Sequence, residues 1–264
     1  MLKTRVLTAL ALLAAFLCVL FLLPRPLMAT AFGMAAGVAA WEWAGLMAAG
    51  GSARVAFVVV VLACCAAGFG VAENAFPILW VISATFWLVA IPFWLRRRWS
   101  LARRKSAAYA VGLIVIIPTW AAMVGLRDRS PWLLLAAMAL VWVADIAAYF
   151  AGRAFGRNKL APNISPGKTW EGVGGAVVGT LVYALLAAAA AGASPLANLG
   201  WAPFLVLLTA ISVAGDLFES MIKRQAGVKD SGNLLPGHGG ILDRIDSQTS
   251  TLPLVALAAH LVAK

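Results

Sequence analysis

Residues 131–150 read PWLLLAAMALVWVADIAAYF, an apolar stretch with one charged side chain, that of Asp145. A membrane-spanning helix needs about 20 mostly apolar residues, so this stretch is predicted to cross a bilayer. Similar stretches lie on both sides of it, at residues 6–23, 27–49, 54–69, 76–95, 107–126, 172–191, 201–222 and 251–263. The pattern predicts an all-α, polytopic integral membrane protein with about nine transmembrane helices. The count falls to eight if the short last stretch only lies at the interface.

The composition supports this fold class. Hydrophobic residues make up 63% of the 264 positions and charged residues 12%, and the mean hydropathy is +0.92. Soluble domains carry about 25% charged residues, so a soluble enzyme, a disordered chain and a coiled coil are all excluded. The three cysteines, Cys18, Cys64 and Cys65, lie in apolar runs and are predicted to be buried thiols without a redox role.

The distribution of basic residues predicts the orientation. The chain has 21 Lys and Arg residues against 10 Asp and Glu residues. With a cytoplasmic N-terminus, the positive-inside rule is obeyed by all but four of the basic residues. The exceptions are Arg25, Arg127, Arg129 and Lys264. This rule accounts for the basic excess without nucleic acid as a partner, and it predicts a multi-pass protein of the cell inner (cytoplasmic) membrane.

The run of basic residues at 96–105 is predicted to be a topology anchor against anionic lipid. The alternative is that it gathers an acidic lipid substrate. Neither an internal repeat nor a long linker divides the chain, which predicts one integral-membrane domain over 1–264. Its helical scaffold is expected over about 1–126 and its catalytic half over about 131–264. The longest hydrophilic stretches, 152–171 and 223–250, are predicted to be cytoplasmic.

Acidic residues inside apolar spans are costly and usually mark function. Glu42, between two tryptophans, is predicted to serve helix packing, whereas Asp145 is predicted to be functional. Asp216, Ser220 and Lys223 follow the i, i+4, i+7 spacing of one helical stripe, which is expected to descend to the cytoplasmic surface.

Acids, bases and glycines are concentrated after this stripe, and such a cluster suits a Mg²⁺–polyphosphate site. Carboxylate oxygens hold Mg²⁺, while basic side chains and glycine N–H groups take the remaining phosphate charge. The alternative is a salt-bridged cytoplasmic loop of a transporter. A transporter would show paired half-sequences with broken helices, whereas the polar residues here lie in one half. The paired glycines Gly33/Gly37 and Gly175/Gly179 are predicted to serve close helix packing.

Residues 220–246 read SMIKRQAGVKDSGNLLPGHGGILDRID, and residues 165–172 read SPGKTWEG. Upstream, Asp145, Tyr149 and the pairs Gly152-Arg153 and Gly156-Arg157 complete the pattern. Residues 145–246 thus resemble the phosphatidate cytidylyltransferases, also called CDP-diacylglycerol synthases. The spans before residue 131 resemble that family only in hydropathy and length.

The resemblance implies that CTP and phosphatidate react to give CDP-diacylglycerol and pyrophosphate, with Mg²⁺ as cofactor. It implies metal-ligand roles for Asp216 and Asp243. Phosphate contacts are expected from the following residues: Ser165, Lys168, Lys223, Arg224, Lys229 and Arg244. Asp230, Asp246 and Glu219 would orient these groups, and Glu219 and Asp246 could hold a second cation.

The remaining expectations concern His238, the oligomeric state and the nearest alternative function. His238 is either a phosphate donor or acid, or a loop histidine bonded to a carbonyl group. The resemblance also suggests a homodimer, and a related CTP-dependent enzyme acting on another lipid is the nearest alternative function.

Overall fold

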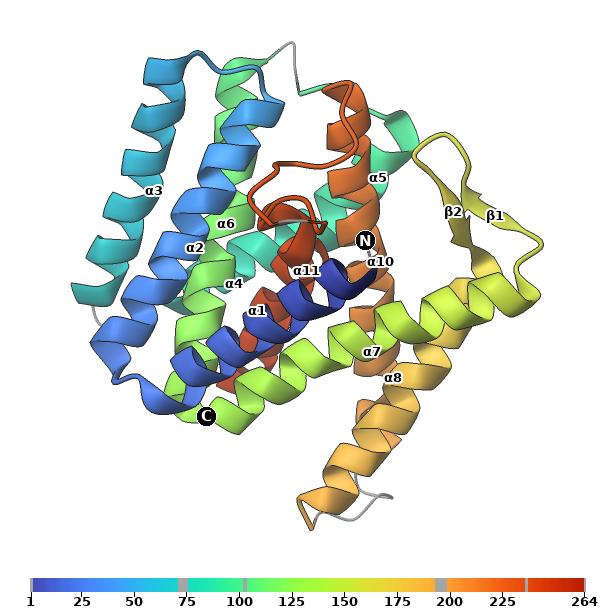
Figure 1. Cartoon of the computed structure of the whole chain (residues 1–264). Helices are drawn as coiled ribbons and strands as arrows, with labels where there is room; N and C mark the ends of the chain where they lie inside the picture. The colour runs from blue at the N-terminus through green and yellow to red at the C-terminus, as the bar shows by residue number, and fades with distance from the viewer. Residues whose placement is uncertain (1, 71–75, 102–103, 193–198, 236, 264) are drawn as a thin grey trace.

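The computed structural model describes residues 2–70, 76–101, 104–192, 199–235 and 237–263, and these form an almost entirely helical molecule (Figure 1). Of the residues named above, positions 102–103 of the basic run, Pro236 of the quoted motif and Lys264 lie outside the described part. Six described helices are long and apolar enough to cross a membrane. They span Gly51–Phe69, Phe76–Arg97, Lys105–Arg129, Pro131–Phe155, Trp170–Ala190 and Ala202–Gln225. The prediction of a polytopic helical fold is therefore confirmed.

Apart from α11, the long helices, labelled as in Figure 1, have bounds close to those of the predicted stretches. The helices are α1 (Leu2–Leu22), α2 (Arg25–Leu46), α3 (Gly51–Gly70), α4 (Phe76–Thr85), the π-helical turn η2 (Phe86–Ala90), α5 (Ile91–Arg97), α6 (Lys105–Arg129), α7 (Pro131–Phe155), α8 (Trp170–Ala190), the 3₁₀ turn η3 (Leu199–Trp201), α10 (Ala202–Gln225) and α11 (Leu242–Val262). The predicted stretch 76–95 forms one continuous helical segment, in which α4, η2 and α5 follow one another without a break.

The two hydrophilic stretches contain more regular structure than predicted. The stretch 152–171 contains an antiparallel hairpin of β1 (Lys159–Ala161) and β2 (Ser165–Thr169), so the fold is not purely helical. The stretch 223–250 is not one loop either, because α11 begins at Leu242 instead of residue 251.

Buried hydroxyl groups explain why the start of α11 was placed too late. The segment 247–251 is fully buried although its side chains are polar. Three of its four hydroxyls bond to backbone carbonyls: Ser250 Oγ donates to Ile211 O at 2.9 Å, Thr251 Oγ1 to Ser247 O at 2.9 Å, and Thr249 Oγ1 to Asp246 O at 2.6 Å. Satisfied polar groups can be buried at little cost, whereas a hydropathy pattern treats them as exposed.

Helix α11 is central in the bundle, packing against α10, α6, α4 and α2. Helices α7 and α8 lie along each other and carry the hairpin at one end (Figure 1). A Cβ at Gly179 would lie 2.6 Å from Ala147 Cβ, and one at Gly175 would collide with Ala151 Cβ. Small residues therefore allow this close approach, as predicted for the second glycine pair.

Three of the four basic residues that break the charge rule bind the ends of helices. Arg25 Nε lies 2.8 Å from Asp128 Oδ2. Arg127 Nη2 donates to Leu23 O at 2.8 Å, and Arg129 Nη1 donates to Ala259 O at 2.5 Å. These side chains bind carbonyls near helix ends and one half-buried acid, which gives them a structural reason to lie at that end of the bundle. The three cysteines are free thiols, of which only Cys65 is buried.

Candidate active site

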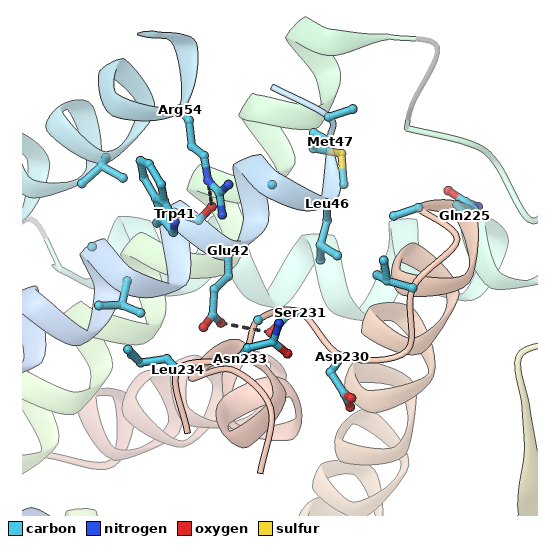
Figure 2. A pocket seen from close by; sticks show the side chains of 18 of the residues that line it. Trp41, Glu42, Leu46, Met47, Arg54, Gln225, Asp230, Ser231, Asn233 and Leu234 are labelled. Atoms are coloured by element: carbon cyan, nitrogen blue, oxygen red, sulfur yellow. Dashed lines mark hydrogen bonds between the residues drawn. The ribbon is translucent and has the colours of Figure 1, made fainter. Parts of the chain in front are cut away.

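Two cavities flank the glycine-rich loop, which we define as residues 226–241. The larger, of about 1200 Å³, lies against α2 and the beginning of α3 (Figure 2). The smaller, of about 620 Å³, lies among α7, β2, α8, α10 and α11. Asp230 lines both cavities, so this part of the loop forms a wall between them.

The smaller cavity collects most of the predicted site residues from both hydrophilic stretches. Those that line it are Ser165, Lys168, Asp216, Lys223, Asp230, Asp243, Arg244 and Asp246. Asp145, Tyr149 and Arg153 of the upstream pattern line it as well. Helices α7, α10 and α11 and the hairpin thus bring together residues up to a hundred positions apart in the sequence.

The predicted stripe on α10 is confirmed by its contacts. Ser220 Oγ donates to Asp216 Oδ1 at 3.1 Å, and the other oxygen of Asp216 pairs with Lys168 Nζ at 2.5 Å. Both partners of this ion pair remain about a quarter exposed, so solvent and ligands reach them from the cavity. The contact joins the hairpin to α10 across the site.

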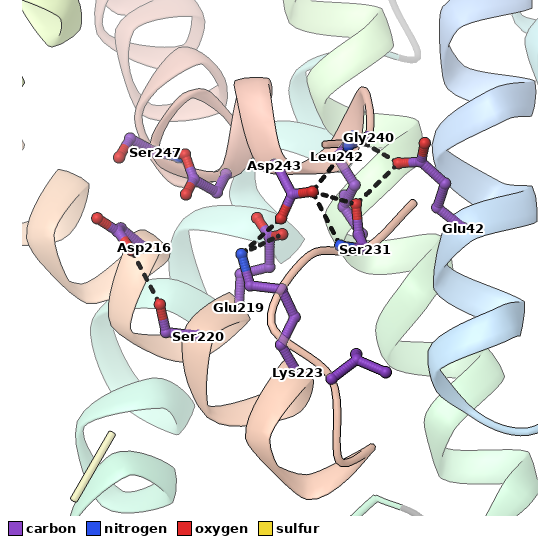
Figure 3. A network of polar contacts seen from close by, with 12 residues as sticks. Glu42, Asp216, Glu219, Ser220, Lys223, Ser231, Gly240, Leu242, Asp243 and Ser247 are labelled. Carbon is purple, nitrogen blue, oxygen red and sulfur yellow. Dashed lines mark hydrogen bonds and ion pairs between the residues drawn. The ribbon is translucent and has the colours of Figure 1, made fainter. Parts of the chain in front are cut away.

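Lys223 is the centre of a buried charge cluster (Figure 3). Its ammonium nitrogen lies 2.6 Å from Asp243 Oδ1 and 3.1 Å from Glu219 Oε1. Glu219 is 4% exposed and does not itself line the cavity. One cation therefore neutralises two carboxylates, and Lys223 itself reaches the cavity wall.

Asp243 is the most heavily bonded carboxylate of the cavity. While Oδ1 binds Lys223, Oδ2 accepts the N–H of Ser231 at 2.8 Å and the N–H of Gly240 at 2.8 Å. The hydroxyl of Ser231 also lies 3.0 Å from Oδ2, and its one proton is shared between this oxygen and Glu42. The side chain thus joins α10, the glycine-rich loop and the first turn of α11. A metal ion at Asp243 would have to replace one of these partners.

Three other carboxylates offer oxygens for a cation. Asp145, Asp216 and Asp246 all border the cavity, close enough together for their charges to repel. Asp246 Oδ1 accepts the N–H of Ser247 at 2.7 Å. In the part of the chain that the structure describes, no three acidic, histidine or cysteine side chains converge as a ready-made metal centre. The donor set nevertheless fits Mg²⁺, which needs only one or two protein carboxylates beside substrate phosphates and water.

Besides Glu219, three predicted residues do not line this cavity. Arg224 is exposed and donates to Val228 O at 3.3 Å, and Lys229 is exposed as well. His238 is half-buried in the glycine-rich loop, where its backbone N–H donates to the backbone oxygen of Leu235 at 2.9 Å. None of the three is brought to the Asp216–Lys168 pair in this arrangement.

The hairpin is fixed to α8 by two contacts that the sequence analysis did not single out. Thr169 Oγ1 accepts the N–H of Gly172 at 3.1 Å and caps α8. Glu171 accepts from the side-chain amide of Asn158 at 2.8 Å. A threonine directly before an apolar run was the available signal for the cap. These contacts hold β2, and therefore Ser165 and Lys168, beside the cavity.

Glu42 was predicted to serve helix packing, and its carboxylate contacts residues 231–242, far along the chain. It accepts the N–H of Ile241 at 3.0 Å, the N–H of Leu242 at 2.8 Å and the hydroxyl of Ser231 at 3.0 Å. These residues belong to the glycine-rich loop and the first turn of α11 (Figures 2 and 3). An acid within an apolar span was the only signal available in the sequence.

Comparison with known proteins shows the family of the chain. The Cytidylyltransferase family profile matches residues 3–262. The chain belongs to this family. It is also 42% identical to a protein of Pseudomonas aeruginosa named "Phosphatidate cytidylyltransferase", over 97% of this chain and 96% of that protein. A Haemophilus influenzae protein of the same name is 38% identical, with 96% of each chain covered.

The cavity of this cytidylyltransferase is chemically suited to phosphates. Lys168 on β2, Lys223 on α10 and Arg244 on α11 bring cationic groups to the lining of the cavity. The carboxylates of Asp145, Asp216 and Asp246 line it as well and offer oxygens for a cation. Reactions between two anionic phosphate groups are accelerated mainly by such charge neutralisation and by alignment of the reactants.

Proposed function

We propose that this cytidylyltransferase transfers the cytidylyl group of CTP to phosphatidate. A phosphate oxygen of the lipid attacks the α-phosphorus of CTP, the bond to the β-phosphate breaks, and pyrophosphate leaves. The observation that carries the proposal is the cavity in which Lys168–Asp216 and Lys223–Asp243 meet, in a chain that matches proteins of that name over nearly its whole length.

The side chains of the cavity have separate proposed roles. Lys168 and Ser165, on β2, would bind phosphates of the nucleotide, and Arg244 would do so from α11. Lys223 would neutralise charge that builds up on the phosphates during transfer, because its ammonium lies at the wall of the cavity. Asp230, which lines both cavities, would orient groups at the wall between them. Arg224, Lys229 and His238 would contact phosphates only if the substrate extends beyond the cavity.

Mg²⁺ is proposed as the cofactor, held by Asp216 and a second carboxylate at the start of α11. Asp243 is the partner that the family resemblance implies, and it would have to exchange its bond with Lys223. Asp246 would not have to break an ion pair, because its carboxylate accepts only the N–H of Ser247 among its described contacts. It is also the proposed ligand for any second cation. Glu219 is less suited to that role, because it pairs with Lys223. When bound, the ion would offset phosphate charge and orient the phosphate oxygens.

We further propose a nine-span topology with the N-terminus and the active site on the cytoplasmic side of the inner membrane. The loop charges support this orientation, and a cytoplasmic site is where a water-soluble nucleotide meets a lipid headgroup. The chain would act as one domain, since α2 of the scaffold half contacts the glycine-rich loop directly. A homodimer is the proposed oligomeric state.

A direct assay tests the function. The purified protein is incubated with phosphatidate, Mg²⁺ and each nucleoside triphosphate in turn, and CDP-lipid and pyrophosphate are measured. We expect both products with CTP and phosphatidate. Turnover of an ether-linked lipid phosphate or an isoprenoid phosphate, with none of phosphatidate, would assign the chain to a different lipid substrate.

A further inference from the structure

We propose that Glu42 is a positioning residue for the transfer reaction: from the scaffold half it holds the glycine-rich loop and the first turn of α11, and thereby the Asp243–Lys223 pair, at the wall of the active cavity. The inference rests on the proposed function for its kinetic consequence. Its structural part depends only on the contacts of Glu42.

The carboxylate of Glu42 is buried and fully engaged. The residue is 3% exposed and accepts two backbone N–H groups at the start of α11 together with the hydroxyl of Ser231. A carboxylate is the best acceptor for this place, because the N-terminal N–H groups of a helix carry partial positive charge and lack partners within the helix. Bonds to a charged acceptor are also stronger than those between neutral groups.

The helix that carries Glu42 is itself held firmly. The neighbouring Trp43 is 1% exposed, its indole N–H donates to Ala108 O at 3.0 Å, and its ring stacks on Phe218 of α10. Glu42 therefore projects from a fixed point in the core. The loop it binds is less enclosed, because residues 230–234 line the larger cavity and Asp230 also lines the smaller one.

Ser231 connects Glu42 to the catalytic charges. Its hydroxyl lies 3.0 Å from an oxygen of Glu42 and 3.0 Å from an oxygen of Asp243, while its N–H donates to the same Asp243 oxygen (Figure 3). The other oxygen of Asp243 binds Lys223. A shift of the loop away from Glu42 would therefore move Asp243 and the ammonium of Lys223 together.

The carboxylate of Glu42 also explains why positions 232 and 240 of the loop are glycines. A Cβ at Gly232 would lie 2.6 Å from Glu42 Oε1, and one at Gly240 would collide with both oxygens of Glu42. Neither glycine has a positive φ, so their backbone conformation does not require glycine. Their lack of a side chain makes room for Glu42, which links the glycine pattern of the motif to a residue almost 200 positions away.

The test compares substitutions that loosen this contact with matched controls. Glu42→Gln removes the charge at nearly constant shape, Glu42→Asp keeps the charge with a shorter reach, and Gly232→Ala pushes on the carboxylate from the loop side. Asp128→Asn is the control for losing a paired carboxylate far from the site, since Asp128 binds Arg25. Gly50→Ala is the control for glycine, because nothing lies within 4 Å of its added Cβ.

The measurements are kcat and KM per folded molecule and hydrogen exchange of the amides of Ile241 and Leu242. We expect Glu42→Gln and Gly232→Ala to lower kcat about 10- to 100-fold with little change in the KM for CTP, and to speed amide exchange about tenfold or more. Glu42→Asp should recover part of kcat. Both controls should leave kcat and exchange at wild-type values.

Separate outcomes would overturn the inference. Faster exchange with unchanged kcat would make Glu42 a purely structural residue, and lower kcat with unchanged exchange would remove its hold on the loop. Additive effects of Glu42→Gln and Ser231→Ala would break the proposed connection through Ser231. A wild-type protein that makes no CDP-lipid would instead overturn the proposed function, and faster exchange in Glu42→Gln would still support the hold on the loop.

Discussion

The contribution of Lys223 to protein stability can be measured separately from its contribution to the rate of the reaction. Lys223→Gln keeps most of the reach of the side chain but removes the positive charge that two carboxylates share, Asp243 at 2.6 Å and Glu219 at 3.1 Å. The side chains involved are at most 11% exposed, so solvent cannot replace the missing charge. Removing one partner of a buried ion pair costs about 3–5 kcal/mol. The single variant should therefore lose substantial stability in addition to activity.

The double variant Glu219→Gln/Lys223→Gln removes the unpaired charge of Glu219 together with the ammonium. Asp243 then keeps its bonds from the N–H groups of Ser231 and Gly240, so most of the lost stability should return. If Lys223 stabilises phosphate charge during transfer, the rate should stay low in both variants. A bond to a charged group is worth about 1.5–3 kcal/mol, which corresponds to roughly 10- to 150-fold in kcat.

The assay combines thermal melting in detergent with kcat and KM for CTP measured on folded protein. Lys105→Gln is the control, because Lys105 is exposed at the start of α6 and should change the rate less than about twofold. Recovery of both stability and kcat in the double variant would refute the reasoning. In that case Lys223 would serve only to neutralise Glu219.

Other expectations can be checked with single variants. Asp216→Asn should abolish turnover without loss of folding, and EDTA should abolish wild-type turnover, because one ligand charge or the ion itself is removed; EDTA-resistant activity would contradict the metal assignment. Of Asp243→Asn and Asp246→Asn, only the variant that removes the second ligand should weaken Mg²⁺ binding, so that more Mg²⁺ is needed for half-maximal activity. Asp243→Asn should also lower the melting temperature, because its bond to Lys223 is lost. A cysteine at the exposed position Asn233 should react with an impermeant thiol reagent only from the cytoplasmic side, in a chain whose three native cysteines are replaced. Gly175→Leu should destabilise the protein by separating α7 from α8, as thermal melting would show.

Much of the fold follows from local sequence properties. Long apolar runs specify helices because the bilayer leaves backbone groups no partner outside their own segment. The helix boundaries of α1 to α8 and of α10 accordingly lie near the predicted ones. The stripe of Asp216, Ser220 and Lys223 was also predictable, since the helical period alone places these residues on one face.

The start of α11 and the hairpin were not predictable in this way. Residues 247–251 are polar, and only their bonds to carbonyls of neighbouring turns and helices make burial favourable. The hairpin strands are short, and they are held by contacts such as that of Thr169 with α8. Hydropathy measures single residues and therefore misses polar groups whose partners are supplied by folding.

The sequence by itself determined the membrane class, the approximate helices and the chemical character of the site, because apolar length, helical period and the motif around Lys223 are local properties. Only the tertiary structure decided which charges meet: Lys168 with Asp216, Lys223 with Asp243, and Glu42 with the glycine-rich loop. These contacts join helices and strands that are distant in the chain. Their geometry depends on how whole helices pack, and no spacing within one segment contains that information.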